Sequence, residues 1–128
     1  MGASIEDLWS MSEKALVAAY ADARRHFAEK KLERDTQRAR LDWMRAKMFV
    51  NTPGGVTERR MAVDVSEELA RKGQEVRETT RDLDLLKIDV DVTETVIRLR
   101  GAHSLGVAQA EDTHDREHGA PEAGREAP

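Results

Sequence analysis

The feature that most constrains this chain is a seven-residue repeat of apolar side chains between residues 57 and 100. The repeat runs without a miss through Ala62, Leu69, Val76, Leu83, Val90 and Ile97. The same segment contains no proline and one glycine, Gly73, and no turn residue separates 74 from 100. A heptad repeat of this length is typical of a helix that packs one stripe against another helix. We therefore expect a helix over 57–100, capped by Thr57 and ending before Gly101.

One stretch of this segment also carries a strand pattern. Residues 88–92 alternate between β-branched and acidic side chains, which favours an extended conformation. A strand needs a partner strand, and no second alternating run exists in the sequence. We therefore interpret 88–92 as part of the helix.

A second long helix is expected over 4–50, where glycine and proline are absent. The turn-rich segment 51–56 (NTPGGV) separates the two helices and predicts a chain reversal. The fold class is therefore all-α: residues 1–100 form an antiparallel coiled-coil hairpin. The expected hairpin core consists of Leu16, Tyr20, Phe27, Leu41, Met44, Met48, Leu69, Val76, Leu83, Val90 and Ile97.

Both helices carry a second set of apolar residues away from this core stripe. A helix in an isolated hairpin buries one stripe, so a second apolar face predicts that a partner covers it. A homodimer that forms a helical bundle is the simplest closed solution, and a further protein partner of unknown identity is also expected. The alternative is that these side chains are exposed singly, as apolar residues often are. The candidate partner interface comprises Leu32, Trp43, Val50, Leu85, Ile88, Val92, Val96 and Leu99.

The net charge of −4 is unevenly distributed. Residues 24–60 hold eleven Lys/Arg against five acids, whereas residues 61–128 hold nine against sixteen. A basic elbow can neutralise phosphates, so nucleic-acid binding is the alternative function, although solvated charged faces explain the pattern better. The acidic second half suggests another alternative, an inhibitor that mimics nucleic acid to a host enzyme. The candidate nucleic-acid contacts are Arg38, Arg45, Lys47, Arg59 and Arg60.

The sequence predicts no enzyme and no cofactor or metal site. The absence of cysteine excludes disulfides, thiolate zinc sites and cysteine nucleophiles. His114–His118 matches the H-x-x-E-H pattern of one metalloprotease class, but Gly119 and Pro121 follow at once, so we interpret the match as chance. Residues 101–128 are polar and are expected to be a disordered tail. No apolar run is long enough to span a membrane, and the N-terminus lacks a secretory pattern, so a cytoplasmic location is expected.

Residues 43–100 resemble, in pattern, the small helical-hairpin proteins encoded by tailed phages and prophages. The similarity lies in 43–47 (WMRAK), 54–62 (GGVTERRMA) and the end of the second helix, 96–100 (VIRLR). It implies a cytoplasmic accessory of replication or recombination that acts through protein contacts. The secreted hairpins of the WXG type are similar in length, but their Trp-x-Gly turn and C-terminal tyrosine signal are missing here.

Overall fold

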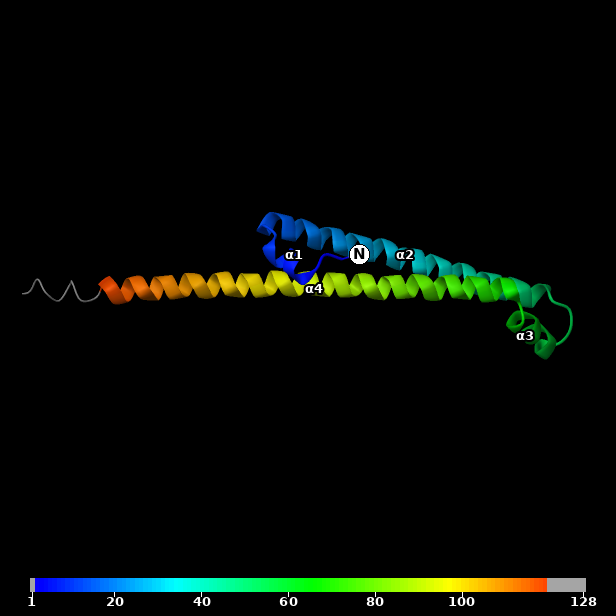
Figure 1. Ribbon diagram of the computed structural model, residues 1–128. Helices are drawn as coiled ribbons and strands as arrows, with labels where there is room; N and C mark the ends of the chain where they lie inside the picture. The colour runs from blue at the N-terminus through cyan, green and yellow to red at the C-terminus, as the bar shows by residue number, and fades with distance from the viewer. Residues whose placement is uncertain (1, 120–128) are drawn as a thin grey trace, which may run out of the picture.

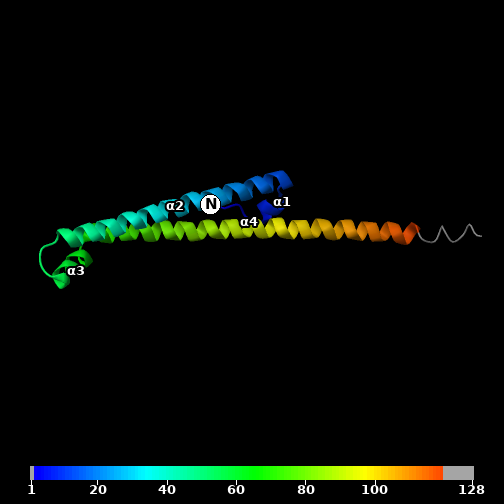
Figure 2. The ribbon, with the colours of Figure 1, turned by 180° about the vertical axis from the view of Figure 1, so that it is seen from behind.

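The computed structural model describes residues 2–119, and the side chains of 2–106, 109 and 110. It is an all-α hairpin, as the sequence predicts (Figure 1). The elements in order are α1 (Ile5–Ser10), α2 (Glu13–Asn51), α3 (Val56–Asp64) and α4 (Glu67–Gly119). The two long helices α2 and α4 pack side by side and antiparallel, which both views show (Figures 1 and 2).

The first predicted helix is interrupted near its start. Ser12 takes an extended backbone conformation, and its hydroxyl accepts a hydrogen bond from the Ala15 N–H at 3.1 Å, so it caps α2. Ser4 caps the short α1 in the same way, through the Asp7 N–H at 3.2 Å. The expected helix 4–50 is therefore two helices, because a second capping serine lies inside it. The break at residues 11–12 lets α1 fold back onto α4 (Figure 1).

The second predicted helix is interrupted as well. Gly54, at φ 107°, makes the turn after α2, and Gly55 rather than Thr57 is the N-cap of α3. The chain then breaks at Val65–Ser66, where the Ser66 hydroxyl accepts from the Leu69 N–H at 3.3 Å and caps α4. The elbow is thus wider than the expected 51–56 segment, because the short helix α3 lies within it and packs against α2.

At its other end α4 runs past Gly101 to Gly119, so the expected helix end at Gly101 is wrong. The helix projects alone beyond the end of α2, and the side chains of residues 101–106 are exposed (Figure 1). We call residues 101–119 the α4 extension. The predicted disordered tail, 101–128, begins within this helix. Its last nine residues, 120–128, lie outside the described part of the chain.

The hairpin has two apolar clusters, one near each end. Leu8, Leu16 and Val96 form the cluster at the open end, and Leu41, Leu69 and Val76 form the one near the elbow. Of the expected core residues, Leu16, Leu41, Leu69, Val76 and Leu83 are buried, and Tyr20, Phe27, Met44, Met48, Val90 and Ile97 are half-buried.

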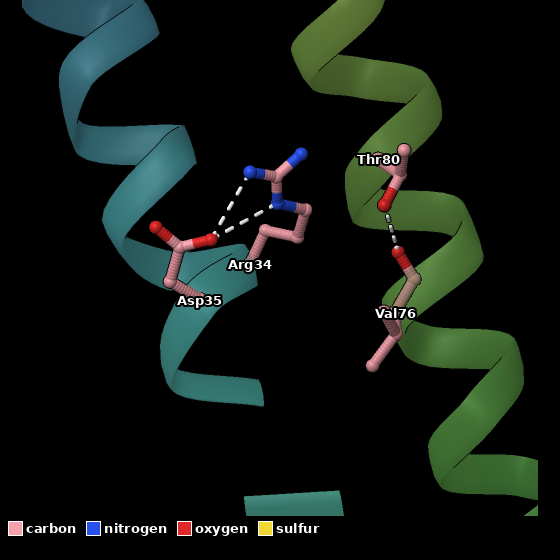
Figure 3. Close-up of polar contacts among 4 residues, drawn as sticks. All are labelled: Arg34, Asp35, Val76 and Thr80. Carbon is pink, nitrogen blue, oxygen red and sulfur yellow. Dashed lines mark hydrogen bonds and ion pairs between the residues drawn. The ribbon is translucent and has the colours of Figure 1, made fainter. Parts of the chain in front are cut away.

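Between the two clusters the α2 stripe becomes polar. Lys30, Arg34 and Gln37 continue the heptad spacing of Phe27 and Leu41, and all three are half-buried. Figure 3 shows Arg34 turned back to the Asp35 carboxylate on its own helix, with two hydrogen bonds of 3.0 and 3.2 Å.

On the facing helix Thr79 is buried, and the Thr80 hydroxyl donates to the Val76 carbonyl at 2.7 Å (Figure 3). The middle of the hairpin is therefore held by fewer apolar contacts than its ends.

Candidate interaction surfaces

The short helix α1 covers part of α4 that the sequence assigned to a partner. Leu8 is 2% exposed and packs with Leu16 and Val96, which is itself 4% exposed. The expected place of Val96 in an open interface is therefore wrong, because α1 already buries it. Val92 is half-buried beside the same cluster and keeps only part of its surface open.

The rest of the predicted α4 face is open. Leu85 is 53% exposed and Leu99 is 54% exposed, and Ile88 between them is exposed to a similar degree. Ile5 of α1 adds an exposed apolar side chain beside Val92 and Leu99, and the three line a shallow groove of about 260 Å³. We call Leu85, Ile88, Val92 and Leu99 the α4 strip.

The predicted α2 face is open along its whole length. Leu32 and Val50 are exposed, and Trp43 is 61% exposed. The Lys47 ammonium lies 4.8 Å from the centre of the Trp43 ring, a cation–π contact. Trp43 also lines a groove of about 740 Å³ between the end of α2 and the start of α4.

Trp43 and Leu85 lie on the same side of the hairpin. Each follows a stripe residue by two positions (Leu41 and Leu83), and equivalent positions of two antiparallel helices point to the same side of the pair. The N-terminal segment occupies this side at the open end, where Ile5 and Leu8 line a groove together with His26. This side of the hairpin is thus covered by α1 at one end and open from His26 to the elbow.

The structure divides the predicted basic elbow between two places. Arg45 and Arg60 line one hollow of about 260 Å³ with Phe49, and the Arg59 guanidinium lies 5.6 Å from the Phe49 ring centre. Lys47 lies apart from them in the Trp43 groove. Arg38 is exposed on α2 and lines neither.

Within residues 2–106, none of the five predicted contacts forms an ion pair with a carboxylate. The five are Arg38, Arg45, Lys47, Arg59 and Arg60. Arg45 and Arg60 share their hollow with Asp64, and Lys47 and Arg59 already cover the aromatic rings beside them.

One ion pair connects the two long helices in the polar middle. The Lys30 Nζ lies 3.2 Å from a Glu33 carboxylate oxygen and 3.7 Å from one of Asp82. The hydrogen bond to Glu33 is the main cause that raises the pKa of Lys30 above its ordinary 10.5; burial opposes it, and the charges of Glu33 and Asp82 add to it. This pair joins α2 to α4 across the polar middle of the hairpin.

The sequence analysis missed the role of α1. Ile5, Leu8 and Trp9 have the spacing of one helical face. Ser12 is a second residue that can cap the N-terminus of a helix, three positions before Ala15. Those two signals together indicate a short separate helix with its own apolar face. Its docking place on Val96 follows only from tertiary packing.

The described residues contain no group of three His, Asp or Glu side chains placed to hold a metal ion. No described helix is long and apolar enough to cross a membrane. The α4 backbone is helical across His114–His118, contrary to expectation, and the side chains of this motif lie outside the described ones.

Comparisons with known protein families, with curated proteins and with solved structures find no match to this chain.

Proposed function

We propose that this chain is a non-enzymatic helical interaction protein that acts through protein–protein contacts on its open apolar faces. The observation that carries the proposal is the set of large apolar side chains left exposed on both long helices after the hairpin core and α1 have formed. They are Leu32, Trp43, Val50, Leu85, Ile88 and Leu99.

The free energy of burying apolar surface favours a partner that covers these side chains. Full burial of a Leu, Ile or Val side chain contributes about 1.5–3 kcal/mol, so covering the open half of each contributes about 1 kcal/mol. An exposed ion pair such as Arg25–Asp22 contributes about 0–1 kcal/mol. Six half-open apolar side chains therefore outweigh the surface charge pairs in any contact that buries them.

The shape of the surface supports the same proposal. The Trp43 groove combines an exposed indole with Met44, Met48 and Leu69 and is bordered by Arg40 and Lys47. Aromatic and methionine side chains with a basic border are typical of the centre and rim of protein interfaces. Trp43 is therefore the expected anchor for a second protein.

Affinity capture with matched variants tests this role. The wild-type chain is expected to retain a specific protein that Trp43→Glu loses, while Lys31→Glu, an exposed change elsewhere on α2, keeps it. The captured protein is then purified and its affinity for the three chains measured directly by calorimetry. Equal affinity for wild type and Trp43→Glu would contradict the assignment of Trp43 to the interface.

Nucleic-acid binding at the elbow is a second candidate function. The observation in its favour is that Arg45 and Arg60 border one hollow with Phe49 and lack carboxylate partners in the described part of the chain. Phosphates are neutralised by such unpaired cations, and bases stack on nearby aromatic rings.

The salt dependence of nucleic-acid binding tests this second candidate function. Binding to single- or double-stranded DNA or RNA is expected to weaken steeply with salt, and Arg45→Glu/Arg60→Glu should remove it. Arg24→Glu/Arg25→Glu, an equal charge change at the open end, serves as the control. No binding of any of these nucleic acids at low salt would contradict the candidate. The predicted accessory role in phage replication or recombination, and the predicted inhibition of a host nucleic-acid enzyme, stay predictions.

A further inference from the structure

We infer that the Trp43 groove binds an amphipathic helix of the partner protein, one that carries two carboxylates about two turns apart beside its apolar residues. The inference rests on the proposed function, which assigns Trp43 to a protein interface, and deepens it by naming the chemistry of the occupant. The walls of the groove come from the last turns of α2, residues 40–52, and from Glu68 and Leu69 at the start of α4.

The cations of the groove lie between its apolar side chains. At 100° per residue, Arg40 and Lys47 share one line along α2. Met44 and Met48 lie on the α4 side of this line, where they pack against the apolar cluster near the elbow, and Trp43 lies on its other side. A surface that covers both the indole and the methionines must therefore also cover the two cations.

Neither cation has a carboxylate partner in the described part of the chain. No ion pair there includes Arg40 or Lys47, and the Lys47 ammonium instead lies over the Trp43 ring at 4.8 Å. A charged group that is taken out of water without an opposite charge beside it destabilises the complex. The occupant must therefore bring carboxylates to the line of Arg40 and Lys47.

The α4 border of the groove has the opposite charge. Glu68 is exposed there and, among the described side chains, forms no ion pair. A helix that is acidic all round would place like charge against Glu68, which is unfavourable. The occupant is therefore acidic along the edge that faces Arg40 and Lys47, and neutral or basic along the edge that faces Glu68.

The spacing of the two cations favours a helix over an extended segment. Arg40 and Lys47 are seven residues apart, which is about 10.5 Å along α2. Carboxylates seven residues apart on a second helix that lies along α2 have the same separation. Residues on one face of a strand are about 6.7 Å or about 13.4 Å apart, and neither distance matches. An amphipathic helix in an apolar groove is also a recurring mode of peptide recognition.

Selection from a displayed library of helices tests the charge of the occupant. Each member has a fixed apolar stripe and carries Glu, Gln or Lys at positions seven apart along one edge. The wild-type chain is expected to enrich Glu at both positions, and Arg40→Glu/Lys47→Glu is expected to enrich Lys. Arg24→Glu/Lys31→Glu is the control, because it makes an equal charge change at equal spacing on an exposed part of α2 outside the groove. It should enrich Glu as the wild type does.

Fluorescence anisotropy with one enriched acidic peptide measures the contribution of each side chain. Trp43→Ala should weaken binding about 30-fold, and Arg40→Glu/Lys47→Glu should weaken it about tenfold or more. Binding to the wild-type chain should weaken as salt rises, and Arg40→Gln/Lys47→Gln should reduce this dependence. Circular dichroism of each variant verifies that the hairpin remains folded.

Four results would overturn the inference. The first three are that no helix in the library depends on Trp43, that the wild-type chain enriches Gln or Lys instead of Glu, and that the charge-reversed variant enriches the same helices as the wild type. The fourth is binding of DNA or RNA that Trp43→Ala removes, which would assign the groove to nucleic acid. After any of the first three, capture of a cellular protein that Trp43→Glu loses would still support the proposed function, so the two failures are distinguishable.

Discussion

The Arg100 guanidinium donates a hydrogen bond of 2.6 Å to the backbone carbonyl of Met11, eighty-nine residues away in the chain. Met11 is the C-cap of α1 and has an extended backbone, and Ser12 after it is the N-cap of α2. The carbonyl of a helix end has no partner within its own helix, and Arg100 supplies one. This contact joins α4 to the junction of the first two helices and marks the point beyond which α4 continues alone.

Arg100→Ala is expected to lower the free energy of unfolding by about 1.5–3 kcal/mol, because a charged donor to a half-buried carbonyl is lost. Urea denaturation followed by circular dichroism measures the change. Arg98→Ala, an exposed arginine on the same helix, is the control and should change stability by less than about 0.5 kcal/mol. Equal effects of the two variants would show that the contact with Met11 contributes nothing.

Gln37→Leu is expected to stabilise the hairpin by about 1 kcal/mol. The Gln37 Oε1 is buried without a hydrogen-bond partner, at a position that continues the apolar stripe. A buried acceptor without a donor destabilises the fold, and leucine both removes it and adds apolar contact. The urea midpoint should rise with an unchanged slope. A lower midpoint would mean that the amide has a partner in solution.

The Lys30 contact predicts a change in stability at alkaline pH. Because folding raises the pKa of Lys30 above 10.5, its stabilising contribution is fully present below that pH and is lost as the pH rises through the folded-state pKa. The difference in unfolding free energy between wild type and Lys30→Met should therefore shrink above pH 10.5. A constant difference between wild type and Lys30→Met across this range would contradict the Lys30–Glu33–Asp82 assignment.

Two glycines distinguish a helix interior from a turn. Gly101 lies inside α4, and nothing lies within 4 Å of a Cβ placed on it, so Gly101→Ala should stabilise the helix by about 1 kcal/mol. Gly54 has φ 107°, and a Cβ there would lie 3.2 Å from the Glu58 Cβ, so Gly54→Ala should destabilise the elbow. Helical content by circular dichroism and urea midpoints measure both. A loss of helix in Gly101→Ala would restore the predicted helix end at this residue.

The sequence predicts the hairpin because its information is periodic. The seven-residue spacing predicts the apolar stripe of α4 from Leu69 to Ile97 without any knowledge of the neighbouring helix. The two glycines at 54–55 predict the chain reversal between the long helices. The polar residues Lys30 and Gln37 are visible in the same way as interruptions of the α2 stripe.

The structure differs from the sequence-based prediction where two local signals compete, or where the outcome depends on tertiary contacts. Ser4, Ser10 and Ser12 are all capable caps, and only the docking of α1 selects Ser12 as a second start. Gly101 is as compatible with a helix end as with a helix interior. The sequence pattern around Val96 does not distinguish it from the exposed apolar residues of α4 near it. The burial of Val96 depends on Leu8, nearly ninety residues earlier in the chain. No local pattern carries that information.

Sedimentation equilibrium of the full chain tests the central claim in its simplest form, that the open apolar faces of one hairpin bind those of a second copy. We expect a mass near twice 14.4 kDa, and a return toward 14.4 kDa in Leu85→Glu/Leu99→Glu but not in Lys87→Glu, an exposed charge change between them. A wild-type mass of 14.4 kDa up to about 100 μM, where a dimer with a Kd of about 1 μM would predominate, would contradict the claim.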